Sequence, residues 1–541
     1  MTRGSFYIFK VKMFLVDYII MRVYNSVGIL GGITEEERSI FQRFTSIFIA
    51  LLLSVFLLAF PLEGYGAIGI FKYRLFLIFC GGYVAVMTIV RCQLALIGSR
   101  PVGNLRERIL EIPISLKLLF FFLIFTIISA LFSSYPGVFT GAFRQDGVLT
   151  ITIYVLTCFF VSRYFRPQKW MIYLLGAGVG LFSLLAFVQL TGANPFALYP
   201  KGYNYYGAGI YYSGEFLSTI GNAGLGAAFV SLAAGALAMA LIKFEFKGKW
   251  LLALPLFIVV LLIFEMGIYA AVVALVTGFL LMLPVAVTNQ KALANTLFVL
   301  AIILAALCLS QILVFQDGSI LFARVRIPFV LVAGFVALLA VLVRKINVFV
   351  TVSRRWYRGG AIAIILAAIV GAFLYLWFYD GATGGMIYEA SQVLRGRWDD
   401  TFGTRRIYIW RNVLENIRLE NLFFGTGPDT LGFWPIEAFT RYIPEIGQTV
   451  VVGIDAAHNE YLHLLVTNGL LALLAYLGAL FFAAINWFRS PDNPLLAVAG
   501  AGMLFYCIQA FFGISTPITA PFFWTCFAVF IYAQNFEGEK T

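Results

Sequence analysis

Residues 250–286 read WLLALPLFIVVLLIFEMGIYAAVVALVTGFLLMLPVA, a long apolar run broken only by Glu265 and Gly267. A helix that crosses a bilayer needs roughly 17–25 mostly apolar residues. We interpret the run as two short membrane spans with a buried turn between them. Such a turn is tolerated at membrane depth only where protein or water covers its backbone. The alternative, a single span, would invert the orientation of everything that follows.

The composition of the whole chain also indicates a membrane protein. Of its 541 residues, 61% are hydrophobic and 12% are charged, whereas soluble globular proteins have about 45–50% apolar and about 25% charged residues. These values exclude a soluble enzyme and a disordered chain. The net charge of +12 does not predict a nucleic-acid partner, because the Lys and Arg residues of membrane proteins collect on cytoplasmic loops.

Residue types that bind metals are scarce or lie in apolar surroundings. The six cysteines lie within or beside apolar runs and form no CxxC pair, which favours their interpretation as small buried hydrophobic residues. The two histidines, His458 and His463, are too few for a His-rich metal cage. We therefore expect no metal site and no cofactor.

The predicted fold is an all-α polytopic membrane protein with about fourteen transmembrane helices and a large extracytoplasmic loop that contains short helices. The candidate spans are all mostly apolar. They lie near residues 44–61, 75–91, 116–132, 148–163, 170–190, 220–241, 250–265, 267–286, 293–313, 327–343, 360–378, 461–487, 494–513 and 516–533.

The distribution of charged residues predicts the orientation of the chain in the membrane, and with the candidate spans it predicts five segments. With the N-terminus inside, most Lys and Arg residues fall on the cytoplasmic side, as the positive-inside rule requires. Arg3, Lys10 and Asp17 share one helix face, which favours an interfacial helix on the inner leaflet over a tilted extra span. The predicted segments are this N-terminal interfacial helix (1–40), a transmembrane bundle of about eleven spans (41–378), the extracytoplasmic loop (379–458), the C-terminal transmembrane helices (459–535) and a cytoplasmic tail (536–541).

The long loop contains GTRRIYIWRNVLENIRLENLFFGTGPDT, residues 403–430. A helix from Arg406 to Leu419 would place Arg406 in one stripe with Trp410, Val413 and Ile417, and Arg411 and Arg418 on the opposite, solvated face. An inward-facing guanidinium is costly unless an anion or a hydrogen-bond network meets it. Arg406 is therefore a candidate phosphate ligand, because its planar fork matches phosphate oxygens. The alternative is an internal salt bridge to Asp399 or Asp400.

Two further motifs follow in the same loop. GTGPDT at 425–430 is neither a P-loop nor a dinucleotide fingerprint. Gly425 and Gly427 predict a tight turn whose backbone approaches another group closely, and both are candidate substrate-binding residues. In DAAHNEYLHLLVTNGLLALL at 455–474, Asp455 is the predicted N-cap of the next helix. His458 would then lie in the first turn, either as a structural group or as a base. His463 is interpreted as structural.

Other polar residues on the outer side carry weaker signals. Arg144 lies in GAFRQDG and Lys201 in YPKGYN, in a Tyr- and Gly-rich segment at 191–218. Each residue type at such a position is more often a surface charge than a ligand. The two long outer segments, at 191–218 and 379–458, exceed the length of simple connectors, and long loops on a rigid scaffold often carry function.

Several of these motifs, in this order, resemble the O-antigen ligase and polymerase superfamily of integral membrane glycosyltransferases. The strongest similarity is in TRRIYIWRNVLENIRLENLFFGTGPDTLG and AHNEYLHLLVTNGLLALL, and weaker similarity lies in SSYPGVFTGAFRQDG and FLSTIGNAGLGAAF. The motifs extend over residues 133–480. The Arg-x-x-x-Trp, Gly-x-Gly-Pro and His-Asn-x-x-Leu set is fairly specific in this order, although no single motif is.

The resemblance implies a function. Members of the superfamily transfer glycans from undecaprenyl diphosphate to an acceptor hydroxyl at the outer face of the bacterial cytoplasmic membrane, without a metal. By position, Arg406 matches the arginine that holds the diphosphate, and His458, accompanied by Asn459, matches the histidine beside the donor or acceptor. The expected partners are therefore an undecaprenyl-diphosphate-linked glycan donor, a glycan or lipid acceptor and membrane lipids, with both chain termini cytoplasmic.

The chain departs from the family pattern in two places. Ligases often carry a further arginine at the outer end of a middle span, where this chain has FEMGIYAAVV with Glu265. Either another cation replaces it, with Arg144, Lys201 and Arg405 as candidates, or the diphosphate is held differently. The region 293–378 is also longer than in compact ligases. Both departures argue against a lipid A ligase and leave a polymerase, or another wall or surface glycan transferase, open.

Two other classes of function compete with a glycosyltransferase. A transporter or flippase of lipid-linked glycans would suit a chain with many spans, but transporters usually place charges at the membrane midplane and repeat two halves. A non-catalytic scaffold would leave the 379–458 loop and its inward arginine unexplained.

Overall fold

The computed structural model describes residues 34–97, 112–203, 216–316, 319–322, 327–346, 352–443 and 448–535. Most of the predicted interfacial helix at 1–40 and the whole predicted tail at 536–541 lie outside these residues. The described chain is mostly helical, with two short antiparallel hairpins, so the prediction of an all-α polytopic architecture is confirmed.

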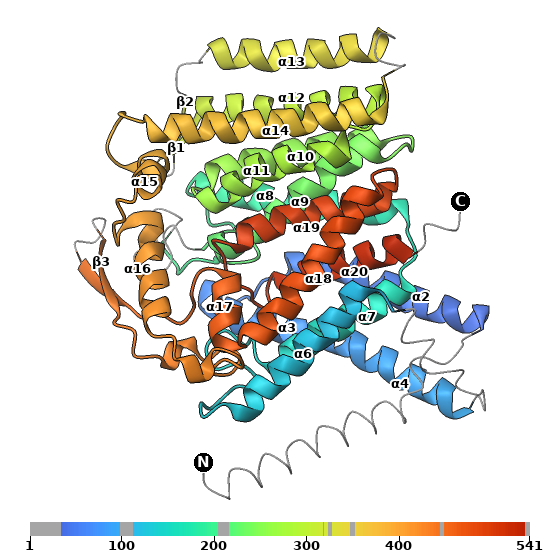
Figure 1. The fold of residues 1–541 in the computed structure, drawn as a ribbon, viewed down its shortest axis with the longest axis vertical. Coiled ribbons are helices and arrows are strands. Elements are labelled where there is room, and N and C mark those ends of the chain that lie inside the picture. The colour runs from blue at the N-terminus through green and yellow to red at the C-terminus, as the bar shows by residue number, and fades with distance from the viewer. Residues whose placement is uncertain are drawn as a thin grey trace, which may run out of the picture.

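The helices of the first half of the chain run back and forth along a common direction (Figure 1). Two of them contain a π-helical turn, η2 (Leu52–Phe56) and η4 (Leu77–Gly81). These helices are α2 (Glu35–Leu51), α3 (Ile68–Phe76), α4 (Gly82–Ile97), α6 (Ile114–Phe132), α7 (Val148–Tyr164), α8 (Lys169–Leu190), α9 (Ala223–Lys243), α10 (Ala253–Glu265) and α11 (Tyr269–Ala286).

The second half adds helices on both sides of a segment that contains both short helices and a hairpin. Strands β1 (Leu313–Gln316) and β2 (Ser319–Phe322) pair, as do β3 (Phe439–Ile443) and β4 (Gln448–Val452), in which Phe439 is opposite Val452. The helices are α12 (Gln290–Ile312), α13 (Ile327–Lys345), α14 (Arg354–Trp377), α15 (Gly385–Leu394), α16 (Phe402–Glu415), α17 (Glu460–Thr467), α18 (Leu470–Arg489), α19 (Pro494–Ala510) and α20 (Ala520–Asn535).

Each of the fourteen predicted spans coincides with a helix or a pair of helices. In the described part of the chain, ten helices are long and apolar enough to cross a membrane, and α7 and α19 are shorter apolar helices. The apolar run at 250–286 forms two helices, α10 and α11, joined at Met266–Ile268, where Gly267 has a φ of 70°. The number of fourteen membrane spans stays a prediction.

Helix α9 forms the centre of the bundle. It is rich in Ala and Gly, and the whole of its apolar segment is buried, because small residues allow neighbouring helices to approach closely. Its closest partner is α19. At Gly235 a Cβ atom would lie 2.7 Å from the carbonyl oxygen of Ala501, so only glycine fits this crossing. In contrast, α13 and α14 lie at one edge of the molecule and are largely exposed (Figure 1).

The predicted continuous span at 461–487 is wrong. The helix breaks after Thr467, and α18 begins at Leu470, following Gly469 with a φ of 91°. The backbone at 422–427 packs into this break: the Leu470 amide donates to the Leu422 carbonyl at 2.8 Å and the Gly427 amide to the Thr467 carbonyl at 2.8 Å. This glycine clasp, defined as residues 422–427 against 466–471, joins the 379–458 segment to the bundle.

Helix α6 supplies polar groups to the same break. Ser129 Oγ donates to the Thr467 carbonyl at 2.9 Å, and Ser133 Oγ donates to the Thr426 carbonyl at 2.5 Å. Asn468 Nδ2 donates to Thr126 Oγ1 at 3.0 Å. The side chains of α6 therefore satisfy carbonyl and amide groups where the helical hydrogen-bond ladder is interrupted, which a membrane environment requires.

Candidate functional site

Arg406 begins the regular part of α16. Residues Gly403, Thr404 and Arg405 have positive φ values, so the chain turns sharply and helical geometry starts at Arg406. The half-buried guanidinium donates from Nη1 to the Gly403 carbonyl at 2.8 Å and from Nε to the Phe512 carbonyl at 3.2 Å. Burial lowers the pKa of Arg406. Since no carboxylate of the described chain pairs with it, an anion would relieve the cost of burying this charge.

The two faces of α16 differ as predicted, although the helix ends at Glu415 rather than Leu419. On the inner face Val413 is fully buried, and Trp410 Nε1 donates to the Ala457 carbonyl at 2.9 Å. On the outer face Arg411 is 52% exposed and pairs with Asp400 at 2.5 Å. The alternative salt bridge from Arg406 to Asp399 or Asp400 is therefore not formed.

Asp429 of the Gly-rich motif holds the loop that carries Arg144. Its Oδ2 accepts the backbone amides of Phe143 at 2.9 Å and Arg144 at 2.7 Å. Asp429 is 1% exposed, and burial raises the pKa of its carboxyl, although these two amides and the Arg144 charge act in the opposite direction. The loop before α7 and the motif at 425–430 are thus one structural unit.

The Arg144 side chain points toward the start of α17. Its Nη2 donates to Asp455 Oδ1 at 2.6 Å. The Nε of the same guanidinium is buried and has no hydrogen-bond partner within the described residues. A buried N–H without a partner is uncommon and points to a ligand or water. The prediction that Asp455 caps the helix is wrong: α17 begins at Glu460, so Asp455 lies four residues before the N-cap, and its carboxylate pairs with Arg144.

Asn459 is the actual N-cap of α17. Its Oδ1 accepts the amides of Leu462 at 3.0 Å and Tyr461 at 3.1 Å. His458 therefore precedes the helix instead of lying in its first turn, and its φ is 48°. Asn and His both tolerate this left-handed conformation better than most residues.

The charges of both arginines affect the pKa of His458. Burial, followed by the positive charges of Arg144 and Arg406, lowers the pKa of His458 to about 4, while Asp455 acts in the opposite direction. The imidazole is therefore neutral at pH 7, the state in which a ring nitrogen accepts a proton. No hydrogen bond to the His458 ring is formed within the described parts of the chain, so the ring is available to a substrate.

The remaining predicted site residues lie in other surroundings. The Arg405 guanidinium stacks over the Phe439 ring at 5.1 Å, on the hairpin side of α16. Lys201 is exposed, and no hydrogen bond or ion pair of the described chain links it to Arg406 or His458. The structure thus places Arg144, rather than Lys201, beside Asp455 at the segment that carries His458.

Gly425 and Gly427 face protein atoms. A Cβ at Gly425 would lie 2.2 Å from the Thr467 carbonyl oxygen, and one at Gly427 would lie 2.6 Å from Ser133 Oγ. The backbone approach that the sequence predicts is therefore made to the α17–α18 break and to α6. This close packing fixes the motif that carries Asp429.

Residues with strained backbone conformations are concentrated in the segments of the candidate site. Seven non-glycine residues of the described chain have a positive φ. Most of them lie in the segments that carry Arg144, Arg406 and His458, namely Gln145, Thr404, Arg405, Asp429 and His458. Such conformations persist where the surroundings over-determine them, and they cluster at functional sites.

A layer of buried carboxyls, which the sequence analysis missed, lies beneath the cations. Glu460 accepts hydrogen bonds from Tyr476 Oη at 3.0 Å and Tyr506 Oη at 3.1 Å. Burial, together with the nearby Asp429 and Glu460, holds the pKa of Asp146 well above its usual value. The described residues contain no group of three or more His, Cys, Asp or Glu side chains that could hold a metal ion; metal independence stays a prediction.

Residues 312–477 match the family model described as O-antigen ligase. This match confirms the predicted resemblance to the O-antigen ligase superfamily over these residues. The matched region contains Arg406, the glycine clasp up to Leu471 and His458, whereas the Arg144 loop lies outside it. A search of curated proteins finds no match to the chain.

The O-antigen ligase match and the apolar helices agree on the general class of the protein. Together they indicate a bacterial membrane protein of the glycosyltransferase type, whose family implies lipid-linked glycan substrates and membrane lipids as partners. The apolar bundle carries the helices, and the polar candidate site lies where the 379–458 segment meets it.

Proposed function

We propose that this protein transfers or polymerises an undecaprenyl-diphosphate-linked oligosaccharide at the outer face of the cytoplasmic membrane. The observation that carries the proposal is that Asp455 holds the Arg144 side chain three residues before His458, that Arg406 lies half-buried without a carboxylate partner among the described residues, and that both charges act on His458. Two cations beside a neutral base fit a reaction in which an anionic diphosphate leaves while an acceptor hydroxyl loses its proton.

In the proposed step, the bond between the anomeric carbon of the donor glycan and the diphosphate oxygen breaks, and the electron pair stays on the diphosphate. The acceptor hydroxyl oxygen forms the new bond to the anomeric carbon, and its proton moves to His458. Arg406 and Arg144 stabilise the growing negative charge of the leaving group, since positioned cations act most strongly where charge develops. The lipid tail lies between apolar helices of the bundle.

Arg144 is the cation that we assign to the place of the missing second family arginine. Its buried Nε, which has no hydrogen-bond partner among the described residues, and its salt bridge to Asp455 favour it over Lys201 and Arg405. Asn459 contributes by capping α17 and so fixing the residue before it.

The test is a transfer assay with purified protein in liposomes and an undecaprenyl-diphosphate oligosaccharide as the only substrate. Arg406→Ala should lower product formation by roughly 10²–10³, as loss of a positioned charge stabiliser does. Arg411→Ala is the matched control, because Arg411 lies on the exposed face of the same helix and should leave the rate unchanged.

The products decide between the remaining activities. An Arg406-dependent ladder of lipid-linked chains identifies a polymerase, and consumption of donor only after a separate acceptor is added identifies a ligase. Donor that crosses the liposome membrane without being consumed would instead support the alternative, a flippase. Equal activity of Arg406→Ala and Arg411→Ala would overturn the assignment of the site.

A further inference from the structure

A cavity of about 290 Å³ lies at the opposite end of the bundle from His458. Helix α7 begins directly after the Arg144 loop and ends at Tyr164, beside the cavity residues Phe165 and Lys169. Helix α19 also runs from the cavity to the candidate site. Its first turn contributes Leu495 to the cavity, and Phe512, just beyond its other end, contacts Arg406. We name this space the basal cavity.

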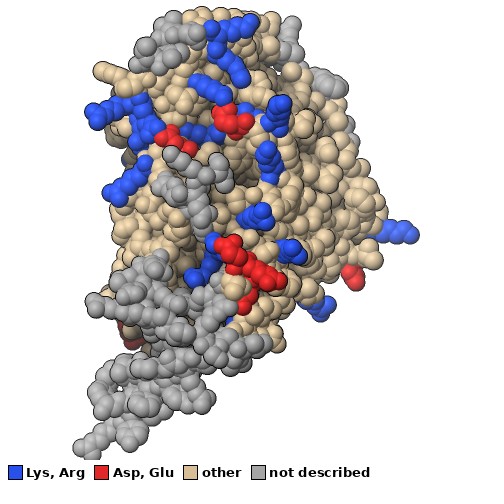
Figure 2. All heavy atoms as spheres, turned by 90° about the vertical axis from the view of Figure 1, so that its right-hand side faces the viewer, with Lys and Arg blue, Asp and Glu red and all other residues tan. Residues whose placement is uncertain are grey.

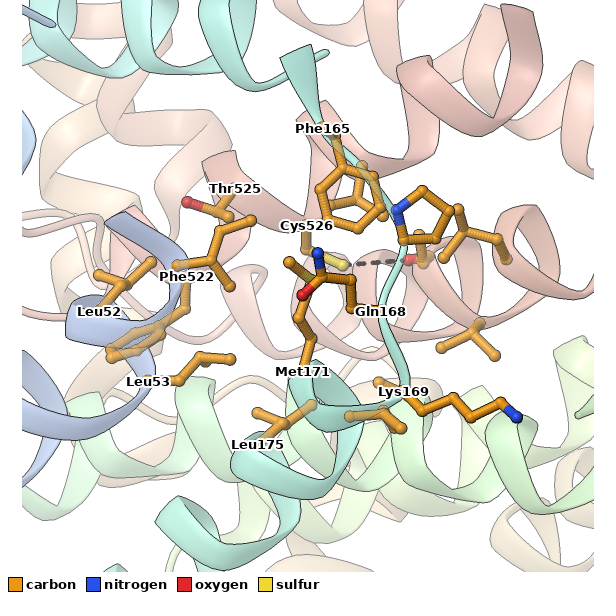
Figure 3. A pocket seen from close by; sticks show the side chains of 18 of the residues that line it. Leu52, Leu53, Phe165, Gln168, Lys169, Met171, Leu175, Phe522, Thr525 and Cys526 are labelled. Atoms are coloured by element: carbon orange, nitrogen blue, oxygen red, sulfur yellow. Dashed lines mark hydrogen bonds between the residues drawn. The ribbon is translucent and has the colours of Figure 1, made fainter. Parts of the chain in front are cut away.

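The walls of the basal cavity are almost entirely apolar. They come from α2, η2, α8, α9, α19 and α20, and Figure 3 shows Leu52, Leu53 and Phe522 together on one side of the cavity. Apolar cavities of about 150 Å³ already stay free of water and bind small apolar molecules. The occupant that fits these walls is therefore a hydrocarbon chain.

The rim of the basal cavity is basic. Lys169 lines it, with the Nζ atom over the Phe246 ring at 5.6 Å and, in Figure 3, directed away from the apolar walls. Arg163 in the last turn of α7 and Arg166 in the connection to α8 are exposed, and within the described residues no carboxylate pairs with any of these three cations.

The whole face around the rim shares this charge. Figure 2 shows Lys and Arg side chains outnumbering Asp and Glu on the face at the right-hand side of Figure 1. Two of the acidic residues at this end, Glu245 and Asp492, are already paired with Lys291 and Arg354. The uncompensated charge at the rim therefore favours an anionic headgroup.

We propose that the basal cavity binds one acyl chain of an anionic phospholipid, whose headgroup contacts Lys169. The cavity opens on the molecular surface, because its lining residues Ile172 and Leu175 are themselves partly exposed. A chain that fills it restores van der Waals contacts that an empty cavity lacks. Each basic residue near a membrane surface enriches anionic lipid about five-fold, so the headgroup supplies the selectivity.

The test uses photoactivatable phosphatidylglycerol that carries a diazirine near the end of one acyl chain. The full-length protein is placed in phosphatidylcholine liposomes with this probe, irradiated, digested and mapped by mass spectrometry. Labels should fall on peptides that contain residues 165–175 and 522–529. A phosphatidylcholine probe with the same chain should label these peptides at least five-fold less.

Two variants test the two parts of the site separately. Leu175→Trp fills the cavity and should abolish labelling there, whereas Leu181→Trp, an exposed position on the same helix, should leave it unchanged. Lys169→Glu changes only the exposed rim and should lower phosphatidylglycerol labelling at least five-fold. It also keeps the test decisive if Leu175→Trp does not fold.

Three outcomes would overturn the proposal. They are equal labelling by the two headgroups, labelling that Lys169→Glu does not reduce, and preferential labelling of the cavity peptides by a photoactivatable polyprenyl phosphate. The last result would assign the basal cavity to a prenyl tail. None of these outcomes depends on transfer activity, so the inference stands or falls separately from the proposed glycosyl transfer.

Discussion

The two ends of the helix bundle differ in how their basic side chains are oriented. At the α16–α17 end, Arg406 and Arg144 are turned inward, held by backbone carbonyls and Asp455, and both act on His458. At the other end, Lys169 and its neighbours stand outward around an apolar hollow. Charge held inside protein must be offset by bound anions or networks, whereas charge at a membrane surface is satisfied by water and lipid headgroups. The same residue types therefore indicate chemistry at one end and lipid binding at the other.

The largest effect that separates the two ends is expected at His458. Asn tolerates the left-handed backbone conformation of this position but cannot act as a base, so His458→Asn should lower kcat/KM for transfer by roughly 10²–10⁴. Its melting temperature should match that of the wild type. Lys169→Glu, at the other end, should leave kcat/KM unchanged; a comparable loss in this variant would show that the two ends are not independent.

A smaller effect is expected at Asp429, which positions Arg144 through two backbone amides. Asp429→Ala removes the acceptor of two partly buried amides and should lower kcat/KM by about ten-fold or more. Asp429→Asn keeps an oxygen at the same place and should retain most of the activity. If the Asn and Ala variants lose activity equally, the charge of Asp429, rather than its hydrogen bonds, would be the important property.

The smallest expected effect concerns the pH dependence of kcat/KM. His458 acts as a base only when neutral, so its contribution is lost as pH falls through its pKa, which is about 4 in the free protein instead of about 6.5. The profile of kcat/KM, which reports the free enzyme, should therefore stay flat from pH 7 to about pH 5. Samples returned from low pH to pH 7 should regain activity. A midpoint near 6.5 that disappears in His458→Asn would contradict the inward-cation arrangement.

The sequence predicted much of the fold because hydrophobic length is a local property. Each predicted span coincides with helix, and the stripe of Arg406, Trp410 and Val413 follows from helical spacing alone. The prediction missed the break at Gly469 because long apolar runs flank it, although Asn468-Gly469 is itself a turn signal. A second signal lay at the polar positions 126, 129 and 133, which repeat at helical intervals in and just after α6.

The candidate site was harder to predict from the sequence than the fold, because its contacts join segments that are far apart in the chain. Asp429 and Phe143 are 286 positions apart, and Arg144 and Asp455 are 311 apart. No periodicity relates such residues, so Asp455 was the predicted cap although Asn459 has that role. It also left Arg144, Lys201 and Arg405 as equal candidates for the second cation, and only the packing of the Arg144 loop on Asp429 favours one of them.

The glycine clasp also sets the order in which the molecule can be completed. Ribosomes make the chain from its N-terminus, so residues 422–427 exist before the helix break that they grip. The contact of the Arg406 guanidinium forms later still, because the Phe512 carbonyl that it contacts lies 106 positions further along the chain. The candidate site is therefore assembled only after α19 has been made and inserted, and a chain that stalls earlier in the membrane presents its arginines without the geometry that they need.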